Sequence, residues 1–441
     1  MKKLILFFVL ISSFCYTQTE DYKQLDSFLD TLSENTKVMA SMSILKKGEL
    51  VYDKSVGYQF ITSEEKRKAT SQSKYRIGSI TKTFTAVMIF ELIDEEKITL
   101  NDKLSKYFPE IKNAANIKIS NMLNHSSGLY NITNADDFGV WMLNPSTQKE
   151  MLSRLEKYDV DFQAGEQTAY SNTNYILLGY ILEQIEKKSY SVLLKERIID
   201  KIGLKNTYAG GIIDINDNEC KSYNYENESW KVTPETHMSN PGGAGAIISN
   251  PTDLALFITE LFNDKLMSKE SLKLMTTASD KDFCSGIFYS EIDGLVIYGS
   301  EGGIDGFQSM LVYIPSTETA IALTANALNY SKMKIMMNAL SVSHGKEIKM
   351  PNMAKIKLTE EEVKQYEGIY ESNEVPFDLV FEAHGAILKG APEQSNLKEL
   401  IATKKDEFRF DELDVVLEFN TGEKTVLFTR GENPSILFNK K

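Results

Sequence analysis

The chain has 441 residues, of which 42% are hydrophobic and 25% charged, and its formal net charge at pH 7 is −13. This length exceeds one ordinary small domain and allows a large core with an appended module. The negative charge repels phosphate backbones, so a nucleic-acid partner is not expected. Beyond the N-terminus no stretch is long and apolar enough to cross a bilayer, so we expect no integral membrane segment after signal cleavage.

The first 17 residues are typical of an export signal. Two lysines precede an unbroken apolar run, residues 4–11, which is too short to span a bilayer but suits the hydrophobic part of a signal peptide. We expect cleavage after Thr17 and a secreted or periplasmic protein. Lipoprotein anchoring at Cys15 is the less favoured alternative, because bulky Phe14 stands where a lipobox has a small residue.

The next part of the chain begins with strands and continues with helices. Apolar runs flanking a short glycine-containing turn predict a β-hairpin over residues 39–56. Residues 83–93 are apolar nearly all round, which predicts a buried helix. Further helices are expected at residues 117–124, 147–157, 174–187, 191–201 and 251–262.

Strand patterns return after residue 286. The expected strands are 287–289, 295–298, 307–314 and 320–324, with a turn at Gly302-Gly303 and a closing helix at 331–343. Strands at both ends with helices between them predict an α/β (α+β) fold. Its antiparallel sheet is flanked by helices on both sides and carries an inserted helical lobe.

Seven short strand-like segments follow residue 350 and predict a C-terminal all-β, barrel-like or sandwich domain. They are residues 366–370, 377–381, 386–388, 407–410, 415–419, 425–428 and 435–438. We therefore divide the chain into a signal peptide (1–17), a main domain (18–350) and a C-terminal β domain (351–441).

The first candidate for chemistry is the pair Ser79 and Lys82. Positions i and i+3 share one face of a helix, so the spacing places a hydroxyl beside an amine at the start of the buried helix. A serine hydroxyl needs a base to become a nucleophile, and a desolvated lysine can serve as that base. By itself the spacing is common, and an N-cap serine followed by a surface lysine is the ordinary alternative.

The second candidate is Tyr170-Ser171-Asn172. In an extended segment, residues i and i+2 point the same way, so Tyr170 and Asn172 are expected to face one pocket. A phenol can shuttle a proton, and a carboxamide can bind a substrate amide. A buried tyrosine beside an N-cap asparagine explains the same residues equally well.

The third candidate is the glycine-rich segment 299–307, which includes Ser300, Gly302 and Gly303. Glycines on an edge strand let a substrate backbone approach closely and leave an N–H free to face an oxyanion. A flexible glycine-rich hairpin is the alternative. The segment is not a phosphate loop, because no lysine and no helix follow it.

Together these three segments resemble the serine β-lactamase-related family of class C β-lactamases, D-alanyl-D-alanine carboxypeptidases and related esterases. The order Ser-x-x-Lys, Tyr-x-Asn and glycine-rich strand is the family's order. Three more stretches resemble it: YRIGSITKTFT (75–85), LNHSSGL (123–129) and PGGAGAIISNPTDL (241–254). The likeness covers roughly residues 22–345, and the tyrosine form of the second motif distinguishes it from class A β-lactamases.

The resemblance implies roles for each candidate. Ser79 would be acylated, while Lys82 and Tyr170 would exchange protons with it. Asn172 would orient the substrate, and the N–H groups of Ser79 and Gly303 would form the oxyanion hole. The implied function is a serine hydrolase acting on esters, amides or D-amino-acid peptides.

One position departs from the family pattern. Ser300 stands where the family has His or Lys, and Glu301 stands where it has a small hydroxyl residue. Replacing a cation by a neutral residue and an anion weakens binding of carboxylate-bearing substrates. We therefore expect a preference for uncharged esters or amides, or a reduced rate.

Two alternative functions remain open. The chain could be a weakened, penicillin-binding-like protein that binds cell-wall peptides, or its C-terminal β domain could supply the main binding function. The expected partner is a small-molecule or peptide substrate, with peptidoglycan-derived peptides among the candidates. No cofactor or metal is expected, because no His-Glu-x-x-His motif or paired-cysteine cluster occurs. His125 is expected to be structural, and Cys220 and Cys284 to be free thiols.

Overall fold

The computed structural model describes residues 22–226, 228–278, 284–292, 294–393, 395–431 and 433–441. The predicted signal peptide (1–17) and its alternative anchor Cys15 lie outside the described residues. In the part that is described, no helix combines the length and apolar character needed to cross a membrane.

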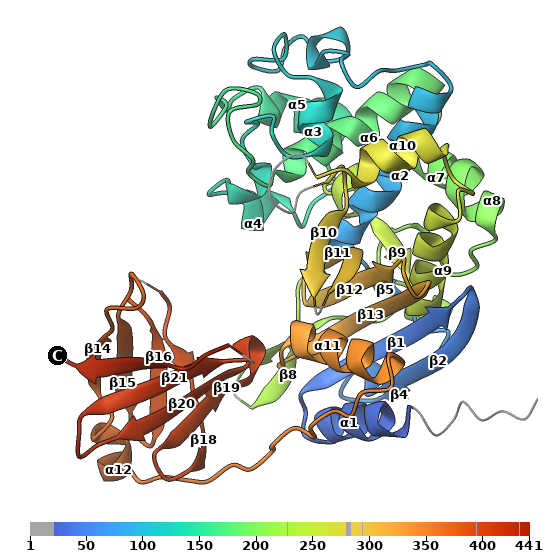
Figure 1. Cartoon of the computed structure of the whole chain (residues 1–441). Helices are drawn as coiled ribbons and strands as arrows, with labels where there is room; N and C mark the ends of the chain where they lie inside the picture. Colours follow the sequence, from blue (N-terminus) through green and yellow to red (C-terminus); the bar gives the residue numbers. More distant parts are fainter. Residues whose placement is uncertain (1–21, 227, 279–283, 293, 394, 432) are drawn as a thin grey trace, which may run out of the picture.

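A mainly antiparallel sheet forms the centre of the larger part of the protein (Figure 1). Its neighbours in space are β10 (Phe288–Ile292), β11 (Leu295–Ile304), β12 (Phe307–Ile314), β13 (Thr319–Leu328), β1 (Val38–Lys46) and β2 (Glu49–Val56). The hairpin of β7 (Tyr223–Glu226) and β8 (Ser229–Val232) joins β13 through one parallel pair, Ala327 with Tyr223.

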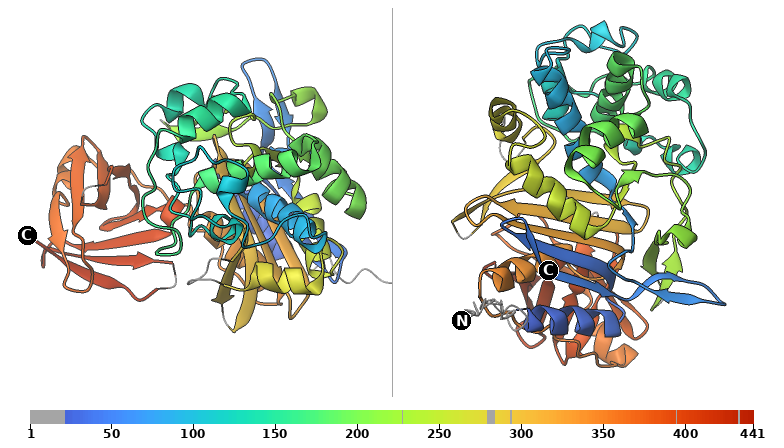
Figure 2. Two further views of the ribbon diagram at one scale, coloured as in Figure 1. Left: turned by 90° about the horizontal axis from the view of Figure 1, so that it is seen from above. Right: turned by 90° about the vertical axis from the view of Figure 1, so that its right-hand side faces the viewer.

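Helices cover both faces of this sheet, which Figure 2 shows edge-on in its right-hand view. One face packs against α1 (Lys23–Glu34) and α11 (Lys332–Ser343), and the other packs against α9 (Pro251–Phe262). The covered, antiparallel sheet confirms the fold class expected from the sequence.

The helical lobe is inserted between β2 and the later strands. It contains α2 (Thr81–Asp94), α3 (Ile119–Leu123), α4 (Phe138–Trp141), α5 (Gln148–Leu155), α6 (Asn172–Glu186), α7 (Tyr190–Leu194) and α8 (Asp200–Ile202). α10 (Lys269–Thr276) packs against it. Short strands connect lobe and sheet: β3 (Tyr58–Ile61) with β4 (Lys66–Lys68), and β5 (Tyr75–Arg76) with β9 (Ile247–Ser249) and β6 (Tyr208–Ala209).

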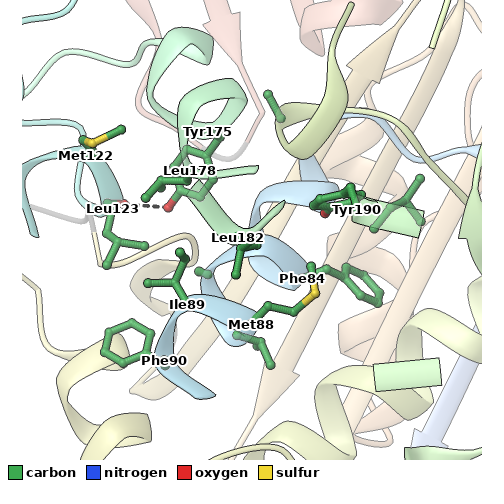
Figure 3. Close-up of a cluster of buried hydrophobic side chains, with 14 of the residues drawn as sticks. Phe84, Met88, Ile89, Phe90, Met122, Leu123, Tyr175, Leu178, Leu182 and Tyr190 are labelled. Atoms are coloured by element: carbon green, nitrogen blue, oxygen red, sulfur yellow. Dashed lines mark hydrogen bonds between the residues drawn. The ribbon is translucent and has the colours of Figure 1, made fainter. Parts of the chain in front are cut away.

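α2 runs through the middle of the apolar core, and residues 81–92 are all buried. The close-up in Figure 3 shows its side chains among those of α3, α6 and α7. Phe84 stacks on Phe257 of α9 with ring centroids 3.7 Å apart, and the Tyr175 hydroxyl donates to the Leu123 carbonyl at 2.6 Å. Close packing on all sides fixes the position of the α2 N-terminus.

The C-terminal region forms a second, antiparallel sheet with its own apolar core, and an extended segment links it to α11 (Figure 1). Its order is β17 (Lys398–Glu399), β16 (Ile387–Pro392), β15 (Leu379–His384), β14 (Gly368–Glu371), β22 (Ile436–Lys440), β21 (Thr425–Arg430), β20 (Val415–Asn420), β19 (Glu407–Phe410) and β18 (Ile401–Lys404). Only Leu400 separates the two end strands, so the sheet nearly closes into a barrel. α12 (Glu360–Lys364) precedes it.

Three local features differ from the sequence-based expectations. The turn expected at Gly302-Gly303 is wrong, because both glycines lie within β11 and the chain reverses at Asp305-Gly306. The helix expected at 191–201 is interrupted by a π-helical turn, Lys195–Ile199. The β7–β8 hairpin and the end strands of the barrel escaped prediction because their sequences are polar and short.

Candidate active site

Ser79 lies in a 3₁₀ turn, Gly78–Ile80, that leads directly into α2. The turn follows β5, which pairs with β9. Gly78 has a φ of +52° and lies so close to the backbone of Gly303 that a Cβ atom there would come within 2.8 Å of it. A glycine at 78 therefore allows the turn to contact β11 directly.

The side chains of Ser79, Lys82 and Tyr170 meet in one hydrogen-bonded group. The Ser79 and Tyr170 hydroxyls are 2.7 Å apart, and the Lys82 Nζ donates to the Ser79 Oγ at 2.9 Å. Two segments far apart in the sequence, one with Ser79 and Lys82 and the other with Tyr170, thus bring a hydroxyl, an amine and a phenol into contact. A serine between two proton-handling groups has the geometry required of a nucleophile.

Lys82 is 3% exposed, and all of its acceptors are uncharged oxygens. Besides Ser79, it donates to the Asn172 Oδ1 and to the Ala244 carbonyl, both at 2.8 Å. Burial lowers the pKa of Lys82 well below its usual value, because no carboxylate among these partners offsets the loss of hydration. The amine therefore gives up its proton more readily than an exposed lysine, as a base for the Ser79 hydroxyl must.

The Tyr170 side chain is 42% exposed, yet its hydroxyl points inward to Ser79. Burial around the hydroxyl raises the pKa of Tyr170 to about 12, and the hydrogen bond from Ser79 opposes this only in part. The Lys82 Nζ lies 4.9 Å from the centre of the Tyr170 ring. A protonated phenol at this point can pass a proton to or from the serine oxygen.

Asn172 is the first residue of α6 and is held at both ends of its amide. Its oxygen accepts from Lys82, while its Nδ2 donates to the Asn131 Oδ1 at 3.3 Å and to the Thr133 Oγ1 at 3.2 Å. These contacts orient the oxygen toward the lysine. Asn131 and Thr133 were not identified from the sequence, because nothing in their local pattern marks them.

His125 supports the site from behind and does not contact Ser79. Its Nδ1 accepts from the Ser171 backbone N–H at 3.2 Å, and its ring centre lies 4.6 Å from that of Tyr170. Burial, and secondarily the charge of Lys82, lowers the pKa of His125 to about 3. A neutral, buried imidazole in this position agrees with the structural role expected for His125.

The end of β11 forms one wall of the site. β10 pairs with β11 only as far as Gly299, so in the described part of the chain residues 300–304 extend beyond that neighbour. The 3₁₀ turn Gly78–Ile80 carries the candidate nucleophile Ser79, and we call it the nucleophile turn. Gly302 lies directly against it, since a Cβ atom there would come within 1.9 Å of the Ile77 carbonyl oxygen. The turn and the strand end are therefore in backbone contact.

Glu301, which the sequence indicates as an anion beside Ser300, has a cationic partner. Its carboxylate forms an ion pair with the Lys332 Nζ at 2.9 Å, and Lys332 comes from the start of α11. Lys332 also donates to the Gln308 Oε1 at 3.4 Å. The expected repulsion of anionic substrates is thus reduced, because a cation accompanies the anion.

Ser79 and Tyr170 lie between two cavities, of about 630 and about 370 Å³. Ser300, Gly302 and Gly303 line the larger cavity, and Asn172 and Gly303 line the smaller one. Of the aromatic residues considered from the sequence, Phe288 lines the larger cavity, and Phe138 and Trp141 line the smaller one. Tyr130 instead stacks on Tyr158, with ring centres 4.3 Å apart.

Within the described residues no group of three or more His, Cys, Asp or Glu side chains is placed to hold a metal ion. Cys220 and Cys284 are buried and do not form a disulfide with each other. The Ala244 carbonyl is the one direct partner of Lys82 that residue type alone does not reveal, although it lies within the glycine-rich stretch 241–254.

The chain is similar to several known proteins. The family model described as Beta-lactamase matches residues 26–345. The chain is 25% identical over 318 residues to the teichoic acid D-alanine hydrolase of Staphylococcus aureus (strain MRSA252). The matched region covers 72% of this chain and 77% of that protein.

Two solved structures share the fold. The octameric penicillin-binding protein homologue from Pyrococcus abyssi has a TM-score of 0.67 at 23% identity, covering 94% of this chain and 99% of that one. The D-stereospecific amidohydrolase from Streptomyces sp. has a TM-score of 0.62 at 24% identity, covering 72% and 97%. The first likeness extends over most of both sheets.

Proposed function

The chain belongs to the beta-lactamase family, and from this premise we propose that it is a serine hydrolase that forms an acyl-enzyme on Ser79. The observation that carries the proposal is the hydrogen-bonded group of Ser79, Lys82 and Tyr170. Without a base near it, the serine hydroxyl would be inert as a nucleophile.

In the proposed reaction, neutral Lys82 accepts the Ser79 proton while the Oγ attacks the carbonyl carbon of an ester or amide. The bond to the leaving group then breaks, and the Tyr170 hydroxyl supplies a proton to the departing oxygen or nitrogen. Water attacks the acyl-enzyme by the reverse proton route. Asn172 keeps Lys82 in place throughout, through the 2.8 Å contact to its Nζ.

The backbone N–H groups of Ser79 and Gly303 are proposed as the oxyanion donors. The contact between the nucleophile turn and β11 at Gly78 supports this assignment. Fixed N–H donors stabilise the tetrahedral intermediate more than the ground state, and losing one such donor costs about 10² to 10³ in rate.

For the substrate we propose esters or amides of D-amino acids. The support is that two relatives are, by name, a teichoic acid D-alanine hydrolase and a D-stereospecific amidohydrolase. The predicted export signal is consistent with a substrate outside the cytoplasm, including peptidoglycan-derived peptides.

A fluorophosphonate probe and D-alanine and L-alanine p-nitroanilides test the proposal. Wild type should be labelled and should cleave the D-anilide faster than the L-anilide, and Ser79→Ala should lose both activities. Unlabelled wild type would favour the alternative of a weakened, penicillin-binding-like protein. Faster cleavage of the L-anilide would reject the D-amino-acid assignment while leaving the hydrolase in place.

A further inference from the structure

The larger cavity beside Ser79 extends well past the reacting groups. From the nucleophile it reaches between α11 and the sheet, where it is lined from β10, β11 and β12 by Ile292, Ile297 and Met310. From α11 it is lined by Met333, Met336 and Met337. Its volume of about 630 Å³ lies within the range of clefts that bind small-molecule ligands.

α11 carries two apolar faces rather than one. Ile335 and Ala339 are fully buried in the core beneath the helix. A second face, with the spacing 333, 336, 337 and 340 that one side of a helix gives, lines the cavity. A helix that only covered a sheet would need a single apolar stripe. On this second stripe Met336 and Leu340 are buried, whereas Met333 and Met337 remain accessible to a ligand.

The charged groups that line the cavity are already engaged. Lys82 contacts Ser79, Asn172 and Ala244, and Glu301 forms its ion pair with Lys332. Among the described lining residues this leaves a mainly apolar surface without an unpartnered charge. Methionine side chains are flexible and polarizable, which suits apolar groups of varied shape.

We propose that this cavity is a binding subsite for a linear apolar chain, such as a medium-length acyl group, attached to the carbonyl that Ser79 attacks. The inference rests on the proposed hydrolase function and widens the acyl group from that of a D-amino acid to a longer apolar chain. Continuity of the apolar space with the nucleophile makes the substrate itself the occupant. Each methylene that leaves water for this space favours binding of the longer ester.

Hydrolysis of p-nitrophenyl acetate and p-nitrophenyl octanoate tests the subsite. Wild type should prefer the octanoate by about tenfold in kcat/KM, because its chain buries additional methylenes. Met337→Trp, which fills the cavity, should remove most of that preference. Met333→Trp should act in the same direction, and its partly exposed position tolerates a larger side chain.

Ser341→Trp is the matched control, since residue 341 is on the same helix and outside the cavity lining. It should keep the wild-type ratio of octanoate to acetate. Equal use of the two esters by wild type, or an unchanged ratio in both methionine variants, would overturn the subsite. Loss of acetate cleavage in Ser79→Ala would still uphold the hydrolase in that case.

A binding measurement separates the two proposals if neither ester is cleaved. The uncharged fluorophore N-phenyl-1-naphthylamine should bind wild type and Ser79→Ala alike, and its Kd should rise about tenfold in Met337→Trp. Equal binding to Met337→Trp and to Ser341→Trp would reject the subsite independently of any hydrolysis.

Discussion

Arg76 and Asp305 form a buried ion pair, with the Arg76 Nη1 2.8 Å from the Asp305 Oδ2 and side chains that are 2% and 0% exposed. Arg76 ends β5 just before the nucleophile turn, and Asp305 begins the turn after β11. The Asp305 Oδ1 also accepts from the Thr236 N–H at 3.0 Å. The pair therefore fixes the nucleophile turn relative to the strand that carries Gly303.

Replacing Asp305 by Asn should break this pair and leave Arg76 with only its longer ion pair to Glu235, at 3.5 Å. We expect the free energy of unfolding to fall by about 3 kcal/mol, because Arg76 is buried and loses the closer of its two carboxylate partners. Urea unfolding measures the change. Asp159→Asn is the control, because its pair with Lys112 is exposed on the surface and is worth less than about 1 kcal/mol. Equal losses in the two variants would contradict the prediction.

Gly302→Ala should displace β11 from the nucleophile turn. The new Cβ atom would come within 1.9 Å of the Ile77 carbonyl oxygen, so the backbones must separate. We expect kcat to fall by about 10² or more, as for loss of an oxyanion donor. At Gly211 an added Cβ meets nothing within 4 Å, and Gly211→Ala should retain activity. An active Gly302→Ala enzyme would argue against this strand as the oxyanion wall.

The pH dependence of kcat/KM should follow Lys82. The proposed base must be neutral, so the rate should rise with pH as Lys82 loses its proton, with a midpoint well below the ordinary value of about 10.4. Tyr170, with a pKa of about 12, stays protonated over this range. Stopped-flow acylation from pH 5 to 10 measures the profile. Lys82→Arg, which cannot lose its proton, should abolish the rise.

The same pKa shift predicts a change in stability. Because the folded-state pKa of Lys82 is below its unfolded value, the unfolded chain binds more protons between the two values. The free energy of unfolding therefore gains a contribution that increases with pH up to about 10.4. Lys82→Met should lack that increase. Identical pH dependence in the two proteins, measured by urea unfolding, would mean that Lys82 keeps an ordinary pKa.

The preference of the enzyme for charged or uncharged substrates should depend on Ser300, Glu301 and Lys332. Ser300→His restores a family-type cation donor, and Glu301→Gln frees Lys332 from its ion pair. Both should raise kcat/KM for carboxylate-bearing substrates by about tenfold relative to neutral esters, because a nearby positive charge attracts the carboxylate. Lys332→Met should have the opposite effect. If Ser300→His gives no improvement, the missing cation does not explain the preference for uncharged substrates.

Local spacing in the sequence was enough to predict most helices and strands and the residue pairs that lie close together in the chain. The helix over residues 251–262 agrees with α9 because proline and an N-cap asparagine define its start. Ser79 and Lys82 share a helical face through their spacing alone, and the apolar run behind them requires burial. The two-residue spacing of Tyr170 and Asn172 predicted that both face one pocket, and both line the smaller cavity, although Asn172 is helical rather than extended.

Contacts between residues that are distant in the chain could not be predicted from local patterns. The contact of Lys82 with the Ala244 carbonyl, the support of Asn172 by Asn131, and the pairing of Glu301 with Lys332 all join segments that are far apart in the chain. The local sequence at Gly302-Gly303 also predicts a turn, whereas pairing with β12 keeps both residues in a strand. Such contacts depend on how whole elements pack, and no local pattern encodes that arrangement.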